Sequence, residues 1–211
     1  MDPLLYLPVA AAAYLLGSIP TGAIVARLYR NLDLTRVGSQ RTGFANATRA
    51  LGLGAGLIVL VGDFAKAAVA VWIAQIVLGT AAGLALAGFL SVLGHIRSVF
   101  LGGRGGRGIV PGLGGLAVAT PGLFVVAAGT GCLVIALTRY VSLGSLAGTV
   151  ATLVVGAGAY ATGMIPVELM LYAVAGSALM IAAHRDNIAR LRAGTERRIG
   201  QPEPVQADGD E

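Results

Sequence analysis

The feature that most constrains the fold of this chain is a series of long stretches with few or no charged residues. One of them, residues 109–137, runs for 29 residues without a charge. A helix needs about 20 apolar residues to cross the hydrocarbon core of a membrane, where every backbone polar group has to be paired within the protein. Because only 12% of the 211 residues are charged, about half the share found in soluble domains, the sequence predicts an all-α, multi-pass membrane helical bundle.

Apolar stretches follow one another along most of the chain. They cover residues 4–28, 51–78, 80–93, 109–137, 141–160 and 164–183. The first is interrupted at residues 17–22 (GSIPTG) and the fourth at residues 120–122 (TPG), and glycine and proline at such places break helices. We expect residues 1–200 to form a single membrane domain and residues 201–211, which are rich in acidic residues and proline, to form a disordered polar tail.

Basic loops define the expected orientation in the membrane. Arginines gather in residues 30–49, 97–107 and 185–198, and basic loops of membrane proteins remain in the cytoplasm. These three loops lie on one side only if residues 109–137 cross the membrane twice, turning at residues 120–122. The sequence therefore predicts seven transmembrane segments, with the N-terminus outside and the C-terminus inside.

The segment LGGRGGRGIV, residues 101–110, combines closely spaced glycines with Arg104 and Arg107. Such glycines expose backbone N–H groups, and guanidinium groups bind phosphate through paired hydrogen bonds. The chain has a net charge of +5, but its sequence contains no basic patch interleaved with aromatic residues. We therefore expect anionic substrates and membrane lipids as partners, and no nucleic acid. The segment predicts an anion-binding site at the cytoplasmic face, formed by either arginine or by both.

The two other basic loops contribute further polar residues. Ser39, Asn46 and Arg49 belong to the first loop, and His184, Asn187 and Glu196 to the last. His184 and Asn187 are three residues apart and share one helical face. We interpret Arg190, Arg192, Arg197 and Arg198 as anchors at the membrane interface. The two histidines of the chain lie on distant segments with no pair of carboxylates near them, so we expect no metal and no cofactor.

Two charged residues, Asp63 and Lys66, lie inside an otherwise apolar stretch. An isolated charge there costs several kcal/mol of insertion free energy, and their spacing of three residues allows them to pair on one helical face. The pair has two interpretations. It either locks helices together or supports the anion-binding site.

Further motifs follow in chain order. They are GSIPTG at residues 17–22, VGS at 37–39, RALG at 49–52, DFAK at 63–66, GH at 94–95, FLGGRGGRG at 100–108, TRYVSLGS at 138–145, HRDNI at 184–188 and GTE at 194–196. In this order they resemble the bacterial acyl-phosphate:glycerol-3-phosphate acyltransferase family over residues 17–200. The resemblance implies an enzyme of the bacterial plasma membrane, with its site facing the cytoplasm. It implies transfer of an acyl chain from acyl phosphate to glycerol 3-phosphate, giving lysophosphatidic acid for phospholipid synthesis.

The resemblance also implies roles for individual residues. His184, Asn187 and Ser39 are the expected catalytic residues, with His184 acting as a general base or orienting the acceptor while a substrate phosphate takes the proton. The expected phosphate-binding residues are Arg49, Arg104, Arg107, Gly105, Gly106, Gly108, Ser142 and Ser145. The expected supporting residues are Asn46, Asp63, Lys66, His95 and Glu196.

The chain departs from the family pattern at several positions. These are Gln40, Arg41, Ala45, Arg97, Ser98 and Pro111, and both lysines of the family's glycine-rich loop are arginine here. Two alternatives to an active acyltransferase therefore stay open. One is a catalytically altered or inactive paralogue that binds anionic lipid or a partner enzyme. The other is a small transporter, although the chain shows no internal repeat of the kind transporters have.

Overall fold

The structure of the protein is a computed structural model that describes residues 2–201. In this range the regular structure is helical, apart from an isolated bridge between Ser98 and Arg104. The α-helices are α1 (Tyr6–Ser18), α2 (Thr21–Arg30), α3 (Phe44–Leu51), α4 (Leu53–Val77), α5 (Ala81–Ile96), α6 (Ile109–Ala119), α7 (Pro121–Thr138), α8 (Val141–Ala161), α9 (Val167–Ala183) and α10 (Arg185–Arg192). Two short 3₁₀ helices, η1 (Pro3–Leu5) and η2 (Val99–Leu101), complete them.

Both predicted helix breaks occur in the structure. Ile19 and Pro20 separate α1 from α2, and Pro20 has no N–H to continue the helix. Thr120 separates α6 from α7, which begins with Pro121 at its first position. The long apolar run of residues 109–137 is therefore two helices of 11 and 18 residues. The basic loop before α4 contains the short helix α3.

Helix length and composition give a lower count of membrane crossings than the seven predicted segments. Among residues 2–201, four helical units are long and apolar enough to span a membrane: residues 3–30, α4, α7 and α8. A fifth is added if α9 and α10, which meet at 60°, form one bent span, and α5 and α6 are apolar but shorter. Large apolar side chains such as Trp72, Leu133 and Val154 are exposed on α4, α7 and α8, as expected for lipid-facing surfaces.

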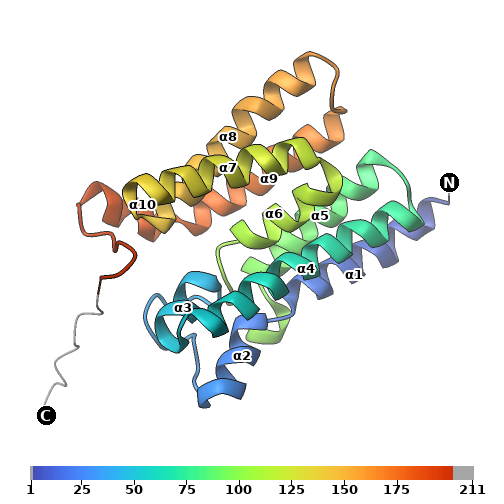
Figure 1. The fold of residues 1–211 in the computed structure, drawn as a ribbon. Coiled ribbons are helices and arrows are strands. Elements are labelled where there is room, and N and C mark those ends of the chain that lie inside the picture. The colour runs from blue at the N-terminus through green and yellow to red at the C-terminus, as the bar shows by residue number, and fades with distance from the viewer. Residues whose placement is uncertain (1, 202–211) are drawn as a thin grey trace, which may run out of the picture.

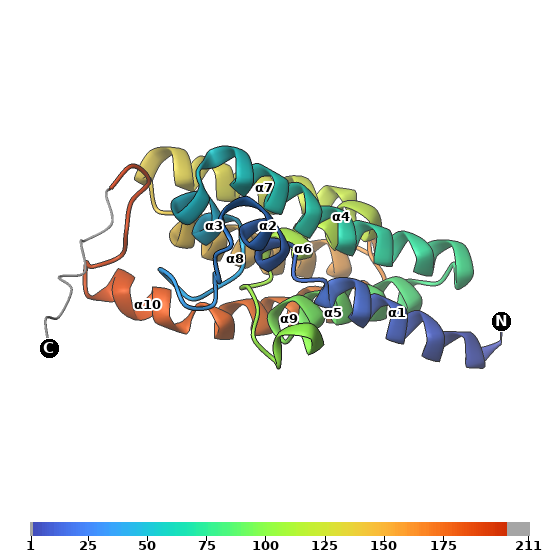
Figure 2. The ribbon, with the colours of Figure 1, turned by 90° about the horizontal axis from the view of Figure 1, so that it is seen from below.

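The helices form an elongated bundle with polar loops at one end. In Figures 1 and 2, α2, α3 and α10 lie at the end opposite the N-terminus, together with the described end of the chain. Helix α1 packs on α5, α4 on α6, and α7 on α8. Glycines permit these close approaches, since a Cβ on Gly17 or Gly94 would overlap the backbone of the facing helix in the α1–α5 pair. The predicted polar tail lies outside the described residues, except for Gln201.

Candidate active site

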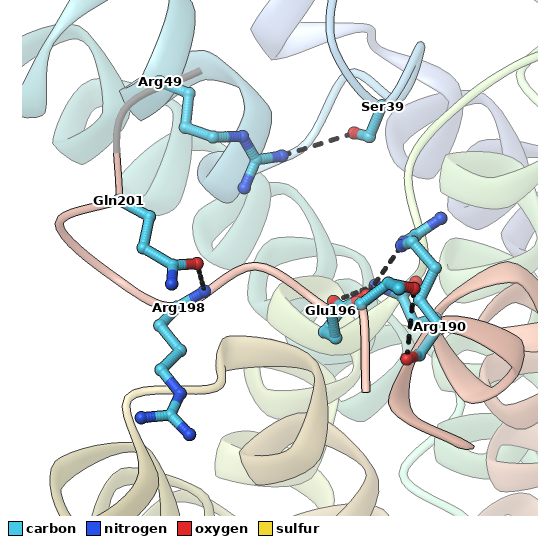
Figure 3. Close-up of polar contacts among 8 residues, drawn as sticks. Ser39, Arg49, Arg190, Glu196, Arg198 and Gln201 are labelled. Atoms are coloured by element: carbon cyan, nitrogen blue, oxygen red, sulfur yellow. Dashed lines mark hydrogen bonds and ion pairs between the residues drawn. The ribbon is translucent and has the colours of Figure 1, made fainter. Parts of the chain in front are cut away.

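The loop between α2 and α3 is held by one amide side chain. Asn46, buried on α3, donates through Nδ2 to the backbone oxygens of Val37 at 3.1 Å and Arg41 at 2.9 Å. Its Oδ1 accepts from the backbone N–H of Ser39 at 3.1 Å. The Arg49 guanidinium lies 3.5 Å from Ser39 Oγ, a contact shown in Figure 3. Asn46 thus shapes the loop that carries Ser39, and Arg49 reaches the same hydroxyl from α3.

The glycine-arginine segment between α5 and α6 is folded tightly against His95. The Gly106 N–H donates to the backbone oxygen of His95 at 3.1 Å. A Cβ on Gly105 would overlap that backbone oxygen, and one on Gly106 would overlap the imidazole ring. Gly108 has φ +85°, which favours glycine. This packing explains why the segment needs glycine beside each arginine, a requirement that positive charge at a loop does not create.

Ser98, one of the departures from the family pattern, anchors the start of the same segment. Its Oγ donates to the backbone oxygen of Ser18 at 2.6 Å, and its N–H donates to the backbone oxygen of Arg104 at 3.2 Å. The side chain is buried. The segment is therefore tied to the end of α1 as well as to α5.

The two arginines of the segment point to different surroundings. Arg104 is exposed and lies near Asp33, where hydrogen bonds from Thr35 and the charges of Arg36 and Arg104 lower the pKa of the Asp33 carboxyl. Burial, together with the charges of Arg41, Arg190 and Arg49, lowers the pKa of Arg107 to about 10. Arg107 Nε is buried and has no hydrogen-bond partner among the residues described.

Arg107 therefore belongs to a group of four arginines. We define this arginine cluster as Arg41, Arg49, Arg107 and Arg190. The charges of Arg41, Arg49 and Arg190 all act on the Arg107 guanidinium. The four side chains come from the α2–α3 loop, α3, the glycine-arginine segment and α10. Three cations act on a fourth whose buried Nε has no hydrogen-bond partner among the described residues, so this region attracts anions.

A carboxylate from the end of the chain balances part of this charge. Glu196 accepts hydrogen bonds from Asn187 Nδ2 and Arg190 Nε, both at 2.7 Å, and the second is drawn in Figure 3. Burial raises the pKa of the Glu196 carboxyl, but Ser142, Asn187 and Arg190 together lower it below its usual value. The carboxylate is thus charged, and its hydrogen bond holds the Asn187 amide in place. The Oδ1 of that amide is also buried and has no hydrogen-bond partner among the described residues.

The residues after α10 fold back onto the α7–α8 turn and so bring Glu196 into place. Ile199 N–H donates to the backbone oxygen of Arg139 at 2.9 Å. The Arg198 guanidinium lies 5.0 Å from the centre of the Tyr140 ring, and its backbone N–H donates to Gln201 Oε1 (Figure 3). The start of α8, which carries Ser142, is therefore adjacent to the end of α10.

The structure gives Arg190 a partner that its interpretation as an interface anchor did not include. Its side chain pairs with Glu196 and belongs to the arginine cluster. Arg41, which sequence reasoning left unassigned, also belongs to it. A signal for Arg190 is present in the sequence, since it follows Asn187 by three residues and shares its helical face.

His184 lies at the junction of α9 and α10, just beyond the apolar helix. Its Nδ1 is 2.7 Å from the backbone oxygen of Met180. A carbonyl only accepts, so Nδ1 carries the proton and Nε2 keeps its lone pair. Burial, together with the charges of Arg107 and Arg41, lowers the pKa of His184 to about 4 despite this hydrogen bond. The imidazole is neutral at physiological pH.

We expect His184 to remain neutral until the pH falls well below 6. Burial and the neighbouring cations both disfavour the imidazolium, so its protonation midpoint should be near 4 in nitrogen-15 NMR of histidine-labelled protein. Inorganic phosphate should raise this midpoint, because it neutralises the adjacent arginines. The signal is assigned with His184→Gln, and a midpoint at the ordinary value of about 6.5 would contradict the burial of this ring.

Three buried polar side chains lie behind the glycine-arginine segment. Lys66 Nζ is 2.9 Å from Asp63 Oδ1, 3.0 Å from His95 Nδ1 and 2.7 Å from the backbone oxygen of Ile19. The predicted Asp63–Lys66 pair therefore exists, and it extends to His95. Because His95 is in contact with Gly105 and Gly106, the pair connects α4 and the α1–α2 break to the loop that presents Arg107.

An apolar cavity of about 130 Å³ lies between α6, α7, α8 and α9. Ile109 and Met180 line it. Ile109 follows Gly108 in the chain, and the backbone oxygen of Met180 is the hydrogen-bond partner of His184. Ser145 also lines the cavity, whereas Ser142 is buried next to Glu196. The two predicted hydroxyl groups therefore face different parts of the site. Among residues 2–201, no three His, Cys, Asp or Glu side chains gather as metal ligands.

The fold and the site together define a class of protein. A bundle of apolar helices carries a cluster of arginines at one end, and its apolar cavity is lined by Ile109 and Met180, which are close in sequence to Arg107 and His184. This combination suits a membrane enzyme that brings phosphorylated groups to a lipid chain.

Comparisons with known proteins identify the family. The family model described as glycerol-3-phosphate acyltransferase matches residues 7–194. A glycerol-3-phosphate acyltransferase of a Synechococcus strain is 45% identical, covering 89% of this chain and 92% of that protein, and one of Thermus thermophilus is 42% identical, covering 90% and 92%. The crystal structure of PlsY, an integral membrane glycerol 3-phosphate acyltransferase, in its glycerol 3-phosphate form is similar, with a TM-score of 0.86 and 36% identity over 92% of this chain and 96% of that one. The chain belongs to the glycerol-3-phosphate acyltransferase family.

Proposed function

We propose that the protein transfers an acyl chain from an acyl phosphate to the 1-hydroxyl of glycerol 3-phosphate, giving lysophosphatidic acid and inorganic phosphate. The observation that carries this proposal is half-buried Arg107 within the arginine cluster, whose buried Nε has no hydrogen-bond partner among the described residues and which lies two positions before Ile109 of the cavity wall. Both substrates carry phosphate, and one also carries an apolar chain. Related PlsY structures are described as glycerol 3-phosphate and lysophosphatidic acid forms.

The bonds made and broken define what the site has to supply. The acceptor hydroxyl oxygen attacks the acyl carbonyl, the bond from the acyl carbon to the phosphate oxygen breaks, and the hydroxyl proton ends on the departing phosphate. Phosphate groups have a second pKa of about 6, whereas the pKa of His184 is about 4. We therefore assign proton acceptance to the phosphate, and assign His184 Nε2 to accepting a hydrogen bond from the hydroxyl and orienting it.

The remaining roles follow from position. Arg49 and Arg107 bind phosphate, assisted by Ser39 and by N–H groups of the glycine-arginine segment other than that of Gly106, which donates to His95. Asn187, fixed by Glu196, presents its unpaired Oδ1 to a substrate hydroxyl. Asn46, Asp63, Lys66 and His95 hold the two loops. Arg104 lies near Asp33, so we do not assign it a phosphate.

We further propose seven transmembrane segments, with the N-terminus outside and the site facing the cytoplasm of a bacterial plasma membrane. Helices α1, α4, α5, α6, α7, α8 and α9 would be these segments. The short α6 and the longer α7 would cross as a pair that turns at Thr120. The arginine-rich loops at the end opposite the N-terminus support this orientation.

Cysteine labelling tests the paired crossing of α6 and α7. In a Cys132→Ala background, we expect Leu137→Cys, exposed near the end of α7, to react with a membrane-impermeant maleimide only after the cells are opened. Thr162→Cys in the exposed α8–α9 turn should react in intact cells. Reaction of Leu137→Cys in intact cells would contradict the paired crossing.

The activity is tested with purified protein, palmitoyl phosphate and labelled glycerol 3-phosphate. We expect labelled lysophosphatidic acid and inorganic phosphate to form in equal amounts. Palmitoyl phosphate without acceptor measures hydrolysis by water and serves as the control. Binding of phosphate without any transfer would instead support an inactive paralogue.

A further inference from the structure

Arg41 contacts an acidic residue across the rim of the arginine cluster. Its Nη2 lies 3.7 Å from Asp186 Oδ2, and the Arg41 side chain is 27% exposed whereas that of Asp186 is 49% exposed. Arg41 belongs to the α2–α3 loop and Asp186 to the first turn of α10, so the pair joins two sides of the site. Asn46 holds the backbone oxygen of Arg41 at 2.9 Å and thereby fixes the base of the side chain.

The Arg41 guanidinium faces the same space as the groups that bind substrate. Asp186 stands between His184 and Asn187 on α10, and the charge of Arg41 acts on both Arg107 and His184. A half-exposed ion pair at 3.7 Å is weak. A phosphate offers the guanidinium two short, charge-assisted hydrogen bonds instead. A phosphate that enters the cluster can therefore replace Asp186 as the partner of Arg41.

Charge balance points the same way. Asp186 is shared, because Arg185 Nε lies 3.5 Å from its Oδ1, so the four guanidinium groups of the arginine cluster and that of Arg185, less the carboxylates of Glu196 and Asp186, leave a net charge of +3. A phosphate monoester carries about −1.5 to −2 at pH 7, so one phosphate does not neutralise this charge. Arg41 is the member of the cluster held by the weaker, more exposed carboxylate.

We infer that Arg41 is a substrate-phosphate ligand that Asp186 holds in the empty site and that exchanges this carboxylate for a phosphate oxygen when substrate binds. The identity of the phosphates rests on the proposed function, whereas the exchange itself requires only a phosphate anion. Asp186 thus competes with substrate for Arg41. Removing the arginine and removing its carboxylate should then have opposite effects on phosphate affinity.

Two probes test this inference: the Kd of inorganic phosphate, from the rise of Tm with its concentration, and the KM of glycerol 3-phosphate. Arg41→Gln should weaken both about tenfold or more, because the charge-assisted hydrogen bonds from Arg41 to phosphate are lost. Asp186→Asn should strengthen both by about threefold, because a weak competing ion pair is gone. The double variant should match Arg41→Gln, since Asp186 has nothing left to compete for.

The matched control is Arg36→Gln, which breaks an ion pair of similar type in the same loop. Arg36 Nε lies 3.3 Å from Asp33 Oδ2, and the Arg36 side chain is 85% exposed, so we expect unchanged Kd and KM. If Arg41 and Asp186 form a purely structural bridge, both single variants will weaken phosphate binding, and the inference is overturned. Unchanged affinity in Arg41→Gln overturns it too. Absence of acyl transfer by the unmodified protein would refute the proposed function, while the phosphate Kd values would still decide the role of Arg41.

Discussion

Arg107→Ala should lower kcat/KM for glycerol 3-phosphate by about 30-fold to several thousand-fold, equivalent to about 2–5 kcal/mol of transition-state stabilisation. Arg107 is half-buried, and its buried Nε has no hydrogen-bond partner among the described residues, so a bound phosphate can supply the acceptor that Nε lacks. Without Arg107, that phosphate would be desolvated and partly unpaired. Initial rates of phosphate release at varied substrate concentrations measure the effect.

The same segment supplies the matched control, because Arg104 is the same residue type three positions earlier, also next to glycine. It is exposed and faces Asp33, so Arg104→Ala should change kcat/KM by less than about threefold. Arg107→Lys should recover part of the activity, since it keeps the charge but not the planar fork. Equal, small effects of both alanine variants would mean that the segment acts as a topology signal alone.

Lys66→Met should destabilise the folded protein by about 3–5 kcal/mol, because it leaves the Asp63 carboxylate buried without its cation. Asp63 is 1% exposed and lies within the apolar helix α4. The variant also removes the Lys66 contacts to His95 and to the backbone of Ile19. Thermal unfolding of the protein in detergent, followed by size-exclusion chromatography, gives the loss of folded material.

The double variant Asp63→Asn/Lys66→Met separates stability from support of the site. It removes both charges, so most of the folded protein should return. His95 would still lack its lysine partner, so the loop that presents Arg107 should be held less firmly and kcat/KM should stay low. Full activity of the double variant would mean that the pair only locks helices, and a fully stable Lys66→Met variant would contradict the pairing.

The sequence predicts the helical class and the main breaks because these depend on local composition. Apolar runs specify the helices. Pro20 lies at the break between α1 and α2, and Pro121 begins α7. His184 and Asn187 share a face by spacing alone. The structure brings them together with Ser142 and Glu196, in agreement with the motifs that carry the family resemblance.

The choice between Arg104 and Arg107 could not be made from sequence, because it depends on how the segment packs. Both arginines have glycine neighbours and equal charge. Their environments differ because Gly105 and Gly106 are pressed against His95, which turns one side chain toward Asp33 and the other toward α10. Arg41 contacts Asp186, which lies far away along the chain. Arg190 contacts Glu196, which lies beyond the end of α10.

The position of the apolar cavity between α6 and α9 has a consequence for how substrates enter and products leave the enzyme. Its wall includes Cys132, an exposed residue of α7, so the cavity reaches the side of the bundle that faces lipid. In the proposed reaction, the polar substrate and inorganic phosphate would exchange with water at the arginine-rich end, while the acyl chain would enter from the bilayer. The acyl donor and the lipid product would then move in the plane of the membrane, whereas the soluble reactants would move between the site and water. Lysophosphatidic acid would be released directly into the bilayer.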